Sequence, residues 1–376
     1  MADLFFFGTL RHVPLLELVM GRAADDLNVS PATLADHGSF EVVEQVFPTI
    51  EHRPGMTAEG ILVRGLSDRD LDRLNFYEGG FSYTLKPLRV DLPDGTSHAA
   101  EVYFPDPGLW TAGSEWDLDA WVADWGPLSM RAAEEAMSYY GRVTADVMVT
   151  RMPSIRIRAA AWLAQQAQEQ DPERDLERDV KVVSHERSHL SFFAMEQMDL
   201  QFRRYDGGMS EVMNRSAALI GAATVVLPYD PLRDTVLLIE QFRAATFIAG
   251  NQTPWMWEPV AGLIDPGETP EDTAYREAVE EAGVTLTALE PVAQVFSSSG
   301  SSGEFVHIFI GLTDLSRLSG GGGLDTEGED IRSQIISFDA LMEGIDRQTY
   351  QDMPLVTAAL WLARHRDRLR EGVGTA

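Results

Sequence analysis

The sequence predicts two domains of mixed structure, an α+β domain at the N-terminus and a strand-rich α/β domain at the C-terminus. The chain has 376 residues, which is more than one domain usually needs. Strand-like and helix-like periodicities alternate on both sides of an Ala-rich stretch that ends in the charged segment "DPERDLERD". We therefore expect domains at 1–128 and 179–376 joined by a helical linker at 129–178. The alternative is that this linker is the helical tail of the first domain.

In the N-terminal domain, "LFFFGTL" predicts a buried strand that runs into a turn at Gly8. A second strand is predicted at "AEGILVRGL". The segment "SDRDLDRLNFYEG" predicts a helix capped by Ser67, because its apolar residues recur at helical spacing. The segment "LKPLRVDLPDGTSHAAEVYF" predicts a hairpin that turns at Asp94 and Gly95. In the linker, "SMRAAEEAMSYYG" and "PSIRIRAAAWLAQQAQEQ" predict helices.

The C-terminal domain begins with two strand-rich segments, "FFAMEQMDLQFRRYDGG" and "AALIGAATVVLPYDPLRDTVLLIEQFR". Their β-branched and aromatic runs are separated by Pro, Asp and Gly, which favour turns. A helix follows at "TPEDTAYREAVEEAG", and further strands are expected at "HIFIGL" and "RSQIISF". The amphipathic segment "PLVTAALWLARHRDRL" predicts a last helix.

Composition excludes several classes of protein. The formal net charge is −29, which argues against a general nucleic-acid binder because such a protein needs a basic face. There are no cysteines, and hence neither a disulfide framework nor a thiolate metal site. The N-terminal residues do not fit a signal peptide, and no stretch is long enough to cross a membrane. We expect a cytoplasmic protein without nucleic-acid or membrane partners.

The helix after "GLIDPGE" places three glutamates, Glu277, Glu280 and Glu281, close together near its C-terminal end. Carboxylates three and four residues apart repel each other, and the C-terminal end of a helix also disfavours negative charge. Thr269 suits the N-cap and Gly283 the C-terminal stop, so the rest of the helix obeys the local rules. We expect a hard divalent cation such as Mg²⁺ at these carboxylates. The alternative is a solvated acidic face.

The stretch "GLIDPGETPEDTAYREAVEEAGV" (262–284) matches the G-x5-E-x7-R-E-U-x-E-E-x-G-U signature, in which U is a bulky aliphatic residue, and only Ala278 is smaller than the usual aliphatic. It resembles the Nudix hydrolases. The resemblance implies an α/β/α sandwich and cleavage of a nucleoside diphosphate linked to another group, with Mg²⁺ as cofactor and Mn²⁺ as the alternative. It further implies that Glu277, Glu280 and Glu281 hold the metal with the carbonyl of Ala261, and that Glu280 is catalytic. Glu268 and Arg276 would brace the loop and helix as an ion pair.

The segment "PLRDTVLLIEQFRAAT" and the following "TPWMWEPVAG" resemble the ADP-ribose pyrophosphatase branch of that family. This resemblance implies a small nucleotide-sugar substrate, ADP-ribose, cleaved to AMP and ribose 5-phosphate by a homodimer formed through the Nudix domain. Arg243 would bind the diphosphate, and Glu258 would lie beside the adenine or the metal. Phe193 or Phe192 would stack on a base from the partner protomer, the alternative being ordinary core.

Two features bear on substrate and catalysis. Ser299 stands where members active on ADP-ribose carry a proline, which leaves GDP-mannose or another sugar nucleotide open as the substrate. A regulator that binds ADP-ribose without cleaving it is the alternative of a different class.

The Gly-rich acidic loop "GGGGLDTEGEDI" offers a mobile catalytic base, which the resemblance assigns to Glu327 with Glu329 as the alternative.

"FFFGTL" and "LDRLNFYEGGFSY" resemble the gamma-glutamylcyclotransferase-like fold, a small β-barrel with flanking helices. The resemblance implies that Phe7, Gly8, Thr9 and Leu10 bind substrate through backbone amides and that Glu78 is the general acid and base. Leu85 stands where the family often has arginine, so a binding or dimer-stabilising domain is the alternative. The arrangement of these two domains in one chain also resembles that of proteins labelled as tellurite-resistance factors.

Overall fold

The computed structural model describes residues 1–78, 83–317 and 330–372. Contacts divide the chain into two units, Met1–Asp175 with His185–Ala194, and Leu176–Ser184 with Met195–Ala376. The Ala-rich helices of the expected linker lie in the first unit. None of the helices in the described ranges is long and apolar enough to span a membrane.

Strands β1 to β5 of the first unit form a closed barrel. The order is β3-β1-β5-β4-β2-β6, and the pairing of β2 with β3 closes the barrel. Phe5, Leu62, Val90 and Val102 fill its interior. The hairpin turns at Asp94 and Gly95 as predicted, with Gly95 in the left-handed region at φ 82°. The strands are β1 (Ala2–Phe6), β2 (Asn28–Val42), β3 (Pro48–Leu66), β4 (Tyr83–Asp91), β5 (Ser97–Pro105) and β6 (Ala112–Glu115).

The helices of this unit cover the outside of the barrel, where Leu4 and Phe6 pack against Leu15 and Trp121. Ser67 caps the second helix as predicted, since its hydroxyl accepts from the Asp70 amide at 3.3 Å. The two long helices begin earlier than the sequence patterns predicted and contain prolines in their interior. The helices are α1 (Val13–Met20), α2 (Asp68–Glu78), α3 (Leu118–Met137) and α4 (Ala145–Gln166).

A three-stranded sheet in the order β7-β8-β9 precedes the second large sheet. It consists of β7 (Val180–Leu190), β8 (Ala194–Phe202) and β9 (Met213–Leu219), and the short helix α5 (Leu176–Asp179) leads into it. The division between the two units passes through β7 and β8, because 185–194 belongs to the first unit.

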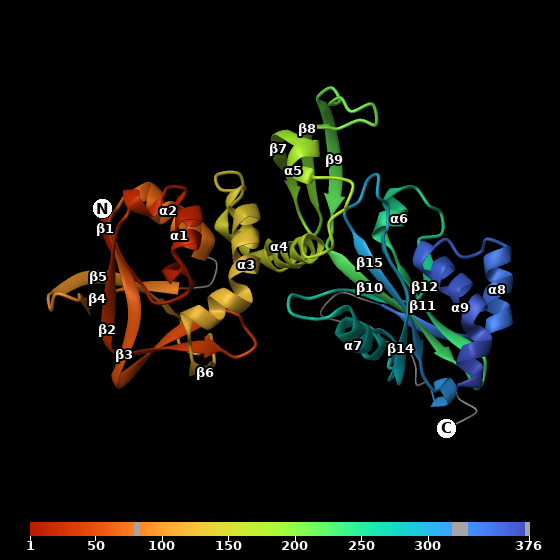
Figure 1. The fold of residues 1–376 in the computed structure, drawn as a ribbon. Coiled ribbons are helices and arrows are strands. Elements are labelled where there is room, and N and C mark those ends of the chain that lie inside the picture. The colour runs from red at the N-terminus through yellow and green to blue at the C-terminus, as the bar shows by residue number, and fades with distance from the viewer. Residues whose placement is uncertain (79–82, 318–329, 373–376) are drawn as a thin grey trace. The chain divides into compact units, whose positions relative to one another are not determined.

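The second unit is built on a mixed sheet in the order β12-β11-β10-β15-β14, with β13 paired to β10 and β16 paired to β11. Helix α7 covers one face through Ala274, Ala278 and Ala282, and α8 and α9 cover the other (Figure 1). The α/β/α sandwich expected for this half is confirmed. Its elements are β10 (Ala222–Asp230), β11 (Thr235–Phe242), α6 (Ala244–Ile248), β12 (Trp255–Glu258), β13 (Val260–Leu263), α7 (Pro270–Ala282), β14 (Ala288–Phe296), β15 (Phe305–Leu312), β16 (Arg332–Ser337), α8 (Phe338–Asp346) and α9 (Met353–Glu371).

Candidate active site in the C-terminal unit

The acidic helix α7 begins and ends where its sequence predicted. The Thr269 side chain accepts from the Asp272 amide, and the Asp272 carboxylate accepts from the Thr269 amide at 3.1 Å, which is a reciprocal capping box. Gly283 ends the helix in the left-handed conformation at φ 62°. These caps fix the phase of the helix, and the phase decides which face each glutamate occupies.

Arg276 holds several of the carboxylates together. Its Nε and Nη2 donate to the two oxygens of Glu268 at 2.8 and 2.9 Å, so the predicted ion pair is confirmed as a two-pronged one. Its Nη1 donates to Glu277 at 2.6 Å and to Glu280 at 3.0 Å. The guanidinium lowers the pKa of Glu268. Arg276 thus offsets much of the like-charge repulsion that is expected among the glutamates of this helix.

Glu281 is the most buried of the three glutamates, with 2% of its surface exposed. One carboxylate oxygen accepts from the Ala261 amide at 2.9 Å, and the other lies 3.5 Å from Nε2 of Gln241. The side chains of Glu277 and Glu280 are 13% and 31% exposed. A solvated acidic face is therefore not what the helix presents.

Gly262 is needed because Glu277 lies against the backbone of β13. A Cβ atom at this position would stand 1.8 Å from Oε1 of Glu277 and 2.2 Å from its Cδ. Neither atom can stay in place beside a side chain at 262. The first position of the signature is therefore glycine for a steric reason, because the Glu277 carboxylate approaches the strand closely.

The carboxylates supply the donors that a hard divalent cation prefers, since all their ligand atoms are oxygens. Within the described ranges, no three Asp, Glu, His or Cys side chains are arranged to hold a metal. Glu277 and Glu280 turn toward Arg276 instead. The donor set fits such a cation in kind, and in this arrangement the guanidinium provides the positive charge.

Arg243 and Glu258, both expected to bind substrate, lie together, since Arg243 directly follows β11 and Glu258 ends the neighbouring strand β12. Nε of Arg243 donates to the two oxygens of Glu258 at 2.8 and 3.1 Å. Burial raises the pKa of Glu258 to about 7, although Arg243 opposes the rise. The Arg243 side chain is 38% exposed, against 8% for Glu258. One end of the pair is therefore open to a ligand.

Sequence reasoning missed two residues here, Gln241 and Asp352. Gln241 is buried on the same face of β11 as Leu237 and Ile239 and reaches Glu281. A polar residue in phase with buried apolar neighbours was the available signal. Asp352 caps α9 by accepting from Leu355 at 2.8 Å, and its charge also raises the pKa of Glu258. No local pattern connects Asp352 with a strand nearly a hundred residues earlier.

Ser299 occupies the second position of a tight turn. The amide of Ser301 donates to the carbonyl of Ser298 at 3.0 Å, and the hydroxyls of the same two residues are 2.9 Å apart. This is the turn position that proline favours. Serine is therefore accommodated at a turn position that also suits proline.

The other predicted residues of this half lie in different surroundings. Phe192 and Phe193 are 50% and 43% exposed, so they are not core. Their rings meet edge to face with centroids 5.0 Å apart. Glu327 and Glu329, the two candidate bases, lie outside the described residues.

In the N-terminal unit, Phe7 and Leu10 are buried, and 9–11 form one 3-10 turn after Gly8. Glu78 is the last residue of α2, and burial raises its pKa to about 7. Burial and the Glu78 charge raise the pKa of Tyr77, Tyr83 and Tyr103. The Glu78 carboxylate therefore lies among phenol groups.

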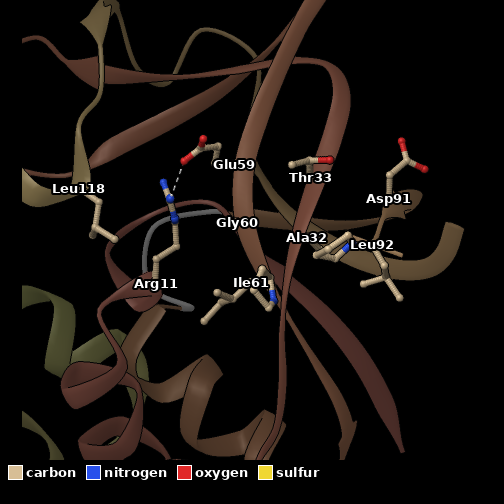
Figure 2. A pocket seen from close by; sticks show the side chains of 11 residues that line it. Arg11, Ala32, Thr33, Glu59, Gly60, Ile61, Asp91, Leu92 and Leu118 are labelled. Atoms are coloured by element: carbon tan, nitrogen blue, oxygen red, sulfur yellow. Dashed lines mark hydrogen bonds and ion pairs between the residues drawn. The ribbon is translucent and has the colours of Figure 1, made fainter. Parts of the chain in front are cut away.

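A pocket of about 440 Å³ opens elsewhere on this unit. Figure 2 shows Arg11 and Glu59 pointing toward each other there, at 3.1 Å. Neither Glu78 nor any residue from Phe7 to Leu10 lines it. The structure thus does not bring the predicted cyclotransferase residues into this pocket, which is lined by Arg11, Pro31, Ala32, Thr33, Glu59, Gly60, Ile61, Asp91, Leu92, Pro93 and Leu118.

Comparison with known proteins agrees with the geometry of the C-terminal site. The sequence profile of the NUDIX domain matches residues 219–353. The ADP-ribose pyrophosphatase of Escherichia coli strain K12 is 36% identical over 192 residues, which span 51% of this chain and 91% of that protein. The chain belongs to the Nudix family. Its Nudix domain is a hydrolase, and divalent metal ions are the usual cofactors of this family.

Two further similarities concern the same half. The GDP-mannose pyrophosphatase of Cronobacter sakazakii is 33% identical over 171 residues, which cover 44% of this chain and 85% of that protein. A solved structure titled "Crystal structure of ADP compounds hydrolase" aligns with a TM-score of 0.41 at 20% identity, over 51% of this chain and 97% of that one.

The N-terminal unit has its own match. The profile described as "Gamma-glutamyl cyclotransferase, AIG2-like" matches residues 4–123. The chain is therefore a fusion of an AIG2-like domain with a Nudix domain, as its two sets of motifs indicated.

Proposed function

We propose that the Nudix domain, at residues 179–376, hydrolyses the diphosphate of an ADP-sugar, with ADP-ribose as the substrate and AMP and ribose 5-phosphate as products. The observation that carries the proposal is the setting of Glu281, a buried carboxylate held between the Ala261 amide and Gln241. The similarity to curated ADP-ribose pyrophosphatases supports this substrate.

Mg²⁺ is the cofactor of this proposal, held by Glu277, Glu280 and Glu281 with the carbonyl of Ala261. The Ala261 amide points to Glu281, and the N–H and C=O of one antiparallel residue point to the same side. The carbonyl is thus on the side of the carboxylates. When bound, the ion would neutralise the diphosphate and lower the pKa of a water. Mn²⁺ could replace Mg²⁺ because the donors are the same.

Arg243 would hold the diphosphate, because an exposed guanidinium fork matches phosphate oxygens. Glu258 keeps the fork oriented from its buried side. A water oxygen then bonds to one phosphorus, its proton passes to the catalytic base, for which we propose Glu327, and the bridging P–O bond breaks. Glu280 is proposed as a further catalytic carboxylate, and Arg276 donates to it at 3.0 Å.

We propose that this domain works as a homodimer in which Phe192 or Phe193 contacts the base bound by the partner protomer. Support comes from exposed apolar side chains on the three-stranded sheet, including Val182, Val183 and Phe202. Light scattering should give twice the 41.6 kDa mass of the chain. A mass of one chain would contradict the dimer.

The decisive experiment is product release from ADP-ribose, GDP-mannose, ADP-glucose and NADH with Mg²⁺, in the parent and in Glu281→Gln. We expect AMP and ribose 5-phosphate from ADP-ribose and a loss of about 100-fold or more in the variant, the range for removing one key polar group from a site. Glu271→Gln, in the exposed first turn of the same helix, is the matched control.

GDP-mannose is the second candidate substrate, favoured by the serine at 299 and by the similarity to a GDP-mannose pyrophosphatase. Cleavage of GDP-mannose without cleavage of ADP-ribose would select it. No product release from any of the four nucleotides, together with tight binding of ADP-ribose, would favour a non-catalytic sensor.

For the N-terminal domain we propose a gamma-glutamyl cyclotransferase. A carboxyl whose pKa is about 7 can both accept and donate a proton near neutral pH. Glu78 would take the proton from the γ-glutamyl amine as that nitrogen attacks the side-chain carbonyl, and would give it to the amine that leaves when the γ-amide C–N bond breaks. The turn at Gly8 and Thr9 would bind the substrate carboxylate. Release of 5-oxoproline from γ-glutamyl amines tests this activity.

A further inference from the structure

The pocket beside Arg11 opens on the outer face of the barrel. Ala32 and Val90 point into the barrel core, and successive side chains of a strand point to opposite faces. Thr33 and Asp91, which directly follow these two residues, therefore point outward. The volume of the pocket, about 440 Å³, lies within the range of small-molecule sites.

Three polar side chains form a row in this pocket. Thr33 on β2 is the register partner of Glu59 on β3 and of Asp91 on β4. Directly paired residues of neighbouring strands place their side chains on the same face, so the Thr33 side chain lies between the two carboxylates (Figure 2). The row spans two strand spacings, or about 10 Å.

Arg11 stands at the Glu59 end of the row and has few partners. An arginine has five N–H donors, and within the described part of the chain only Nη2 of Arg11 has a hydrogen-bond partner, Glu59 at 3.1 Å. Its Nε is buried without one. Charge-assisted hydrogen bonds of this kind are usually shorter, at about 2.7–2.9 Å. The protein therefore leaves much of the binding capacity of this guanidinium unused.

Glu59 is a partner that a ligand can displace. Its side chain is 77% exposed, whereas that of Arg11 is 16% exposed. An ion pair with one partner in solvent contributes little to stability, so Glu59 can rotate into solvent while Arg11 stays in place. A carboxylate from a ligand can then bind the same guanidinium.

The other end of the row carries a negative charge without a partner. No ion pair with Asp91 forms in the described ranges. Between the two ends, Pro31, Ile61 and Leu118 line the pocket with apolar surface. Pro31 and Ile61 are register partners two residues before Thr33 and two residues after Glu59, so they share the face of the polar row.

We propose that this pocket binds a basic α-amino acid. The ligand carboxylate binds Arg11, the α-ammonium binds Glu59 and the Thr33 hydroxyl, and the cation of the ligand side chain binds Asp91. The two carboxylates and one guanidinium of the pocket thus match the two cationic groups and one carboxylate of the ligand.

The length of such a ligand also suits the row. A lysine side chain extends about 6 Å over five bonds of about 1.5 Å, and the side chains of Glu59 and Asp91 cover the rest of the distance. Its aliphatic stem covers the apolar surface at Pro31 and Ile61. The site is separate from Glu78, and it does not depend on the proposed cyclotransferase activity.

Isothermal titration calorimetry of the full-length chain with L-lysine at pH 7 tests this site. We expect one site per chain and binding that is weaker by about tenfold or more in Arg11→Met and in Asp91→Asn, the size of a lost hydrogen bond to a charged group. Glu51→Gln is the matched control, because Glu51 is a carboxylate of the same strand as Glu59 that pairs with Arg53 outside the pocket. It should bind L-lysine as the parent does.

Two analogues test the two ends of the ligand. L-Norleucine has the stem of lysine without its cation, and cadaverine lacks the carboxylate. Each should bind more weakly than L-lysine by about tenfold or more, for the same reason as in the variants. An analogue that binds as tightly as L-lysine would show that one end is not recognised and would overturn the proposal.

The remaining outcomes also decide the matter. The proposal is wrong if L-lysine does not bind, or if it binds Asp91→Asn as tightly as the parent. Asp91 is exposed, so this variant keeps the fold even where Arg11→Met does not. Glu78→Gln should bind L-lysine like the parent, since Glu78 does not line the pocket. Loss of binding in that variant would assign the ligand to the cyclotransferase residues instead.

Discussion

Single side chains carry most of the chemistry of the Nudix site, and their positions follow from steric and electrostatic requirements. Glu277 lies against the bare backbone of Gly262, and Glu281 is buried against the Ala261 amide. Glu258 is buried enough to bind a proton near neutral pH. Each of these features can be changed by one substitution.

Gly262→Ala should reduce kcat/KM for nucleotide hydrolysis by about 100-fold, because a displacement of about 1 Å at a catalytic group can cost that much. The added Cβ would stand 1.8 Å from Oε1 of Glu277, so the carboxylate must move. Gly300→Ala is the control, since no atom lies within 4 Å of a Cβ there. Parent-like kinetics in Gly262→Ala would contradict the assigned role of Glu277.

Glu258 should make the folded protein less stable as pH rises. Its folded pKa of about 7 lies above the ordinary value of 4.5, so between these values the folded chain binds more protons than the unfolded chain. The free energy of unfolding should therefore fall from about pH 4.5 to about pH 7, by at most about 3 kcal/mol. Urea unfolding across this range should show a shallower fall in Glu258→Gln. Equal slopes in both proteins would refute the prediction.

At the scale of elements, the turn between β10 and β11 is joined to the last helix by charge. Asp234 has φ 58°, and its carboxylate pairs with Arg366 and lies 2.9 Å from Nη1 of Arg370. The Tyr229 hydroxyl also donates to it at 2.8 Å. The hydrogen bond from Arg366, followed by those from Tyr229 and Arg370, lowers the pKa of Asp234 to about 2. Helix α9 is thereby anchored to the sheet that it covers.

Asp234→Asn should reduce the free energy of unfolding at pH 7 by about 2 kcal/mol, which corresponds to the lowered pKa. Asparagine tolerates the left-handed backbone, so the charge is the main change. Since the folded pKa lies below 3.8, the difference from the parent is full above pH 4 and should vanish as pH falls through about 2. Asp314→Asn, a 68% exposed carboxylate, should have little effect. A difference that persists at pH 2 would argue for a backbone cause.

At the scale of the molecule, two domains with separate cores share one chain. The barrel core around Phe5 and Val102 is distinct from the cores on the two faces of the Nudix sheet. The helices α3 and α4 and the tip of the β7–β8 hairpin at 185–194 belong to the first unit. Two independent catalytic sites are therefore expected.

Glu78→Gln should abolish release of 5-oxoproline and leave kcat/KM for ADP-ribose as in the parent, because Glu78 ends a helix of the N-terminal unit. Both activities are measured on the same preparation. A fall in nucleotide hydrolysis in this variant would show that the two sites depend on each other.

Local patterns in the sequence determined the caps of α7, and the resemblance of its motif to the Nudix signature implied the Glu268–Arg276 pair and the α/β/α class of the C-terminal half. The caps depend on residues a few positions apart, where helical geometry fixes the distances.

Only the tertiary structure decided the contacts between distant residues. Strand pairing brings Arg243 to Glu258, sheet-to-helix packing brings Gln241 to Glu281, and the cap of α9 brings Asp352 near Arg243 and Glu258. The contact of Arg158 with the Phe192 carbonyl joins a helix to a hairpin tip 34 residues later. Such contacts depend on strand register and on the packing of helices, and neither is set by the residues nearby in the chain.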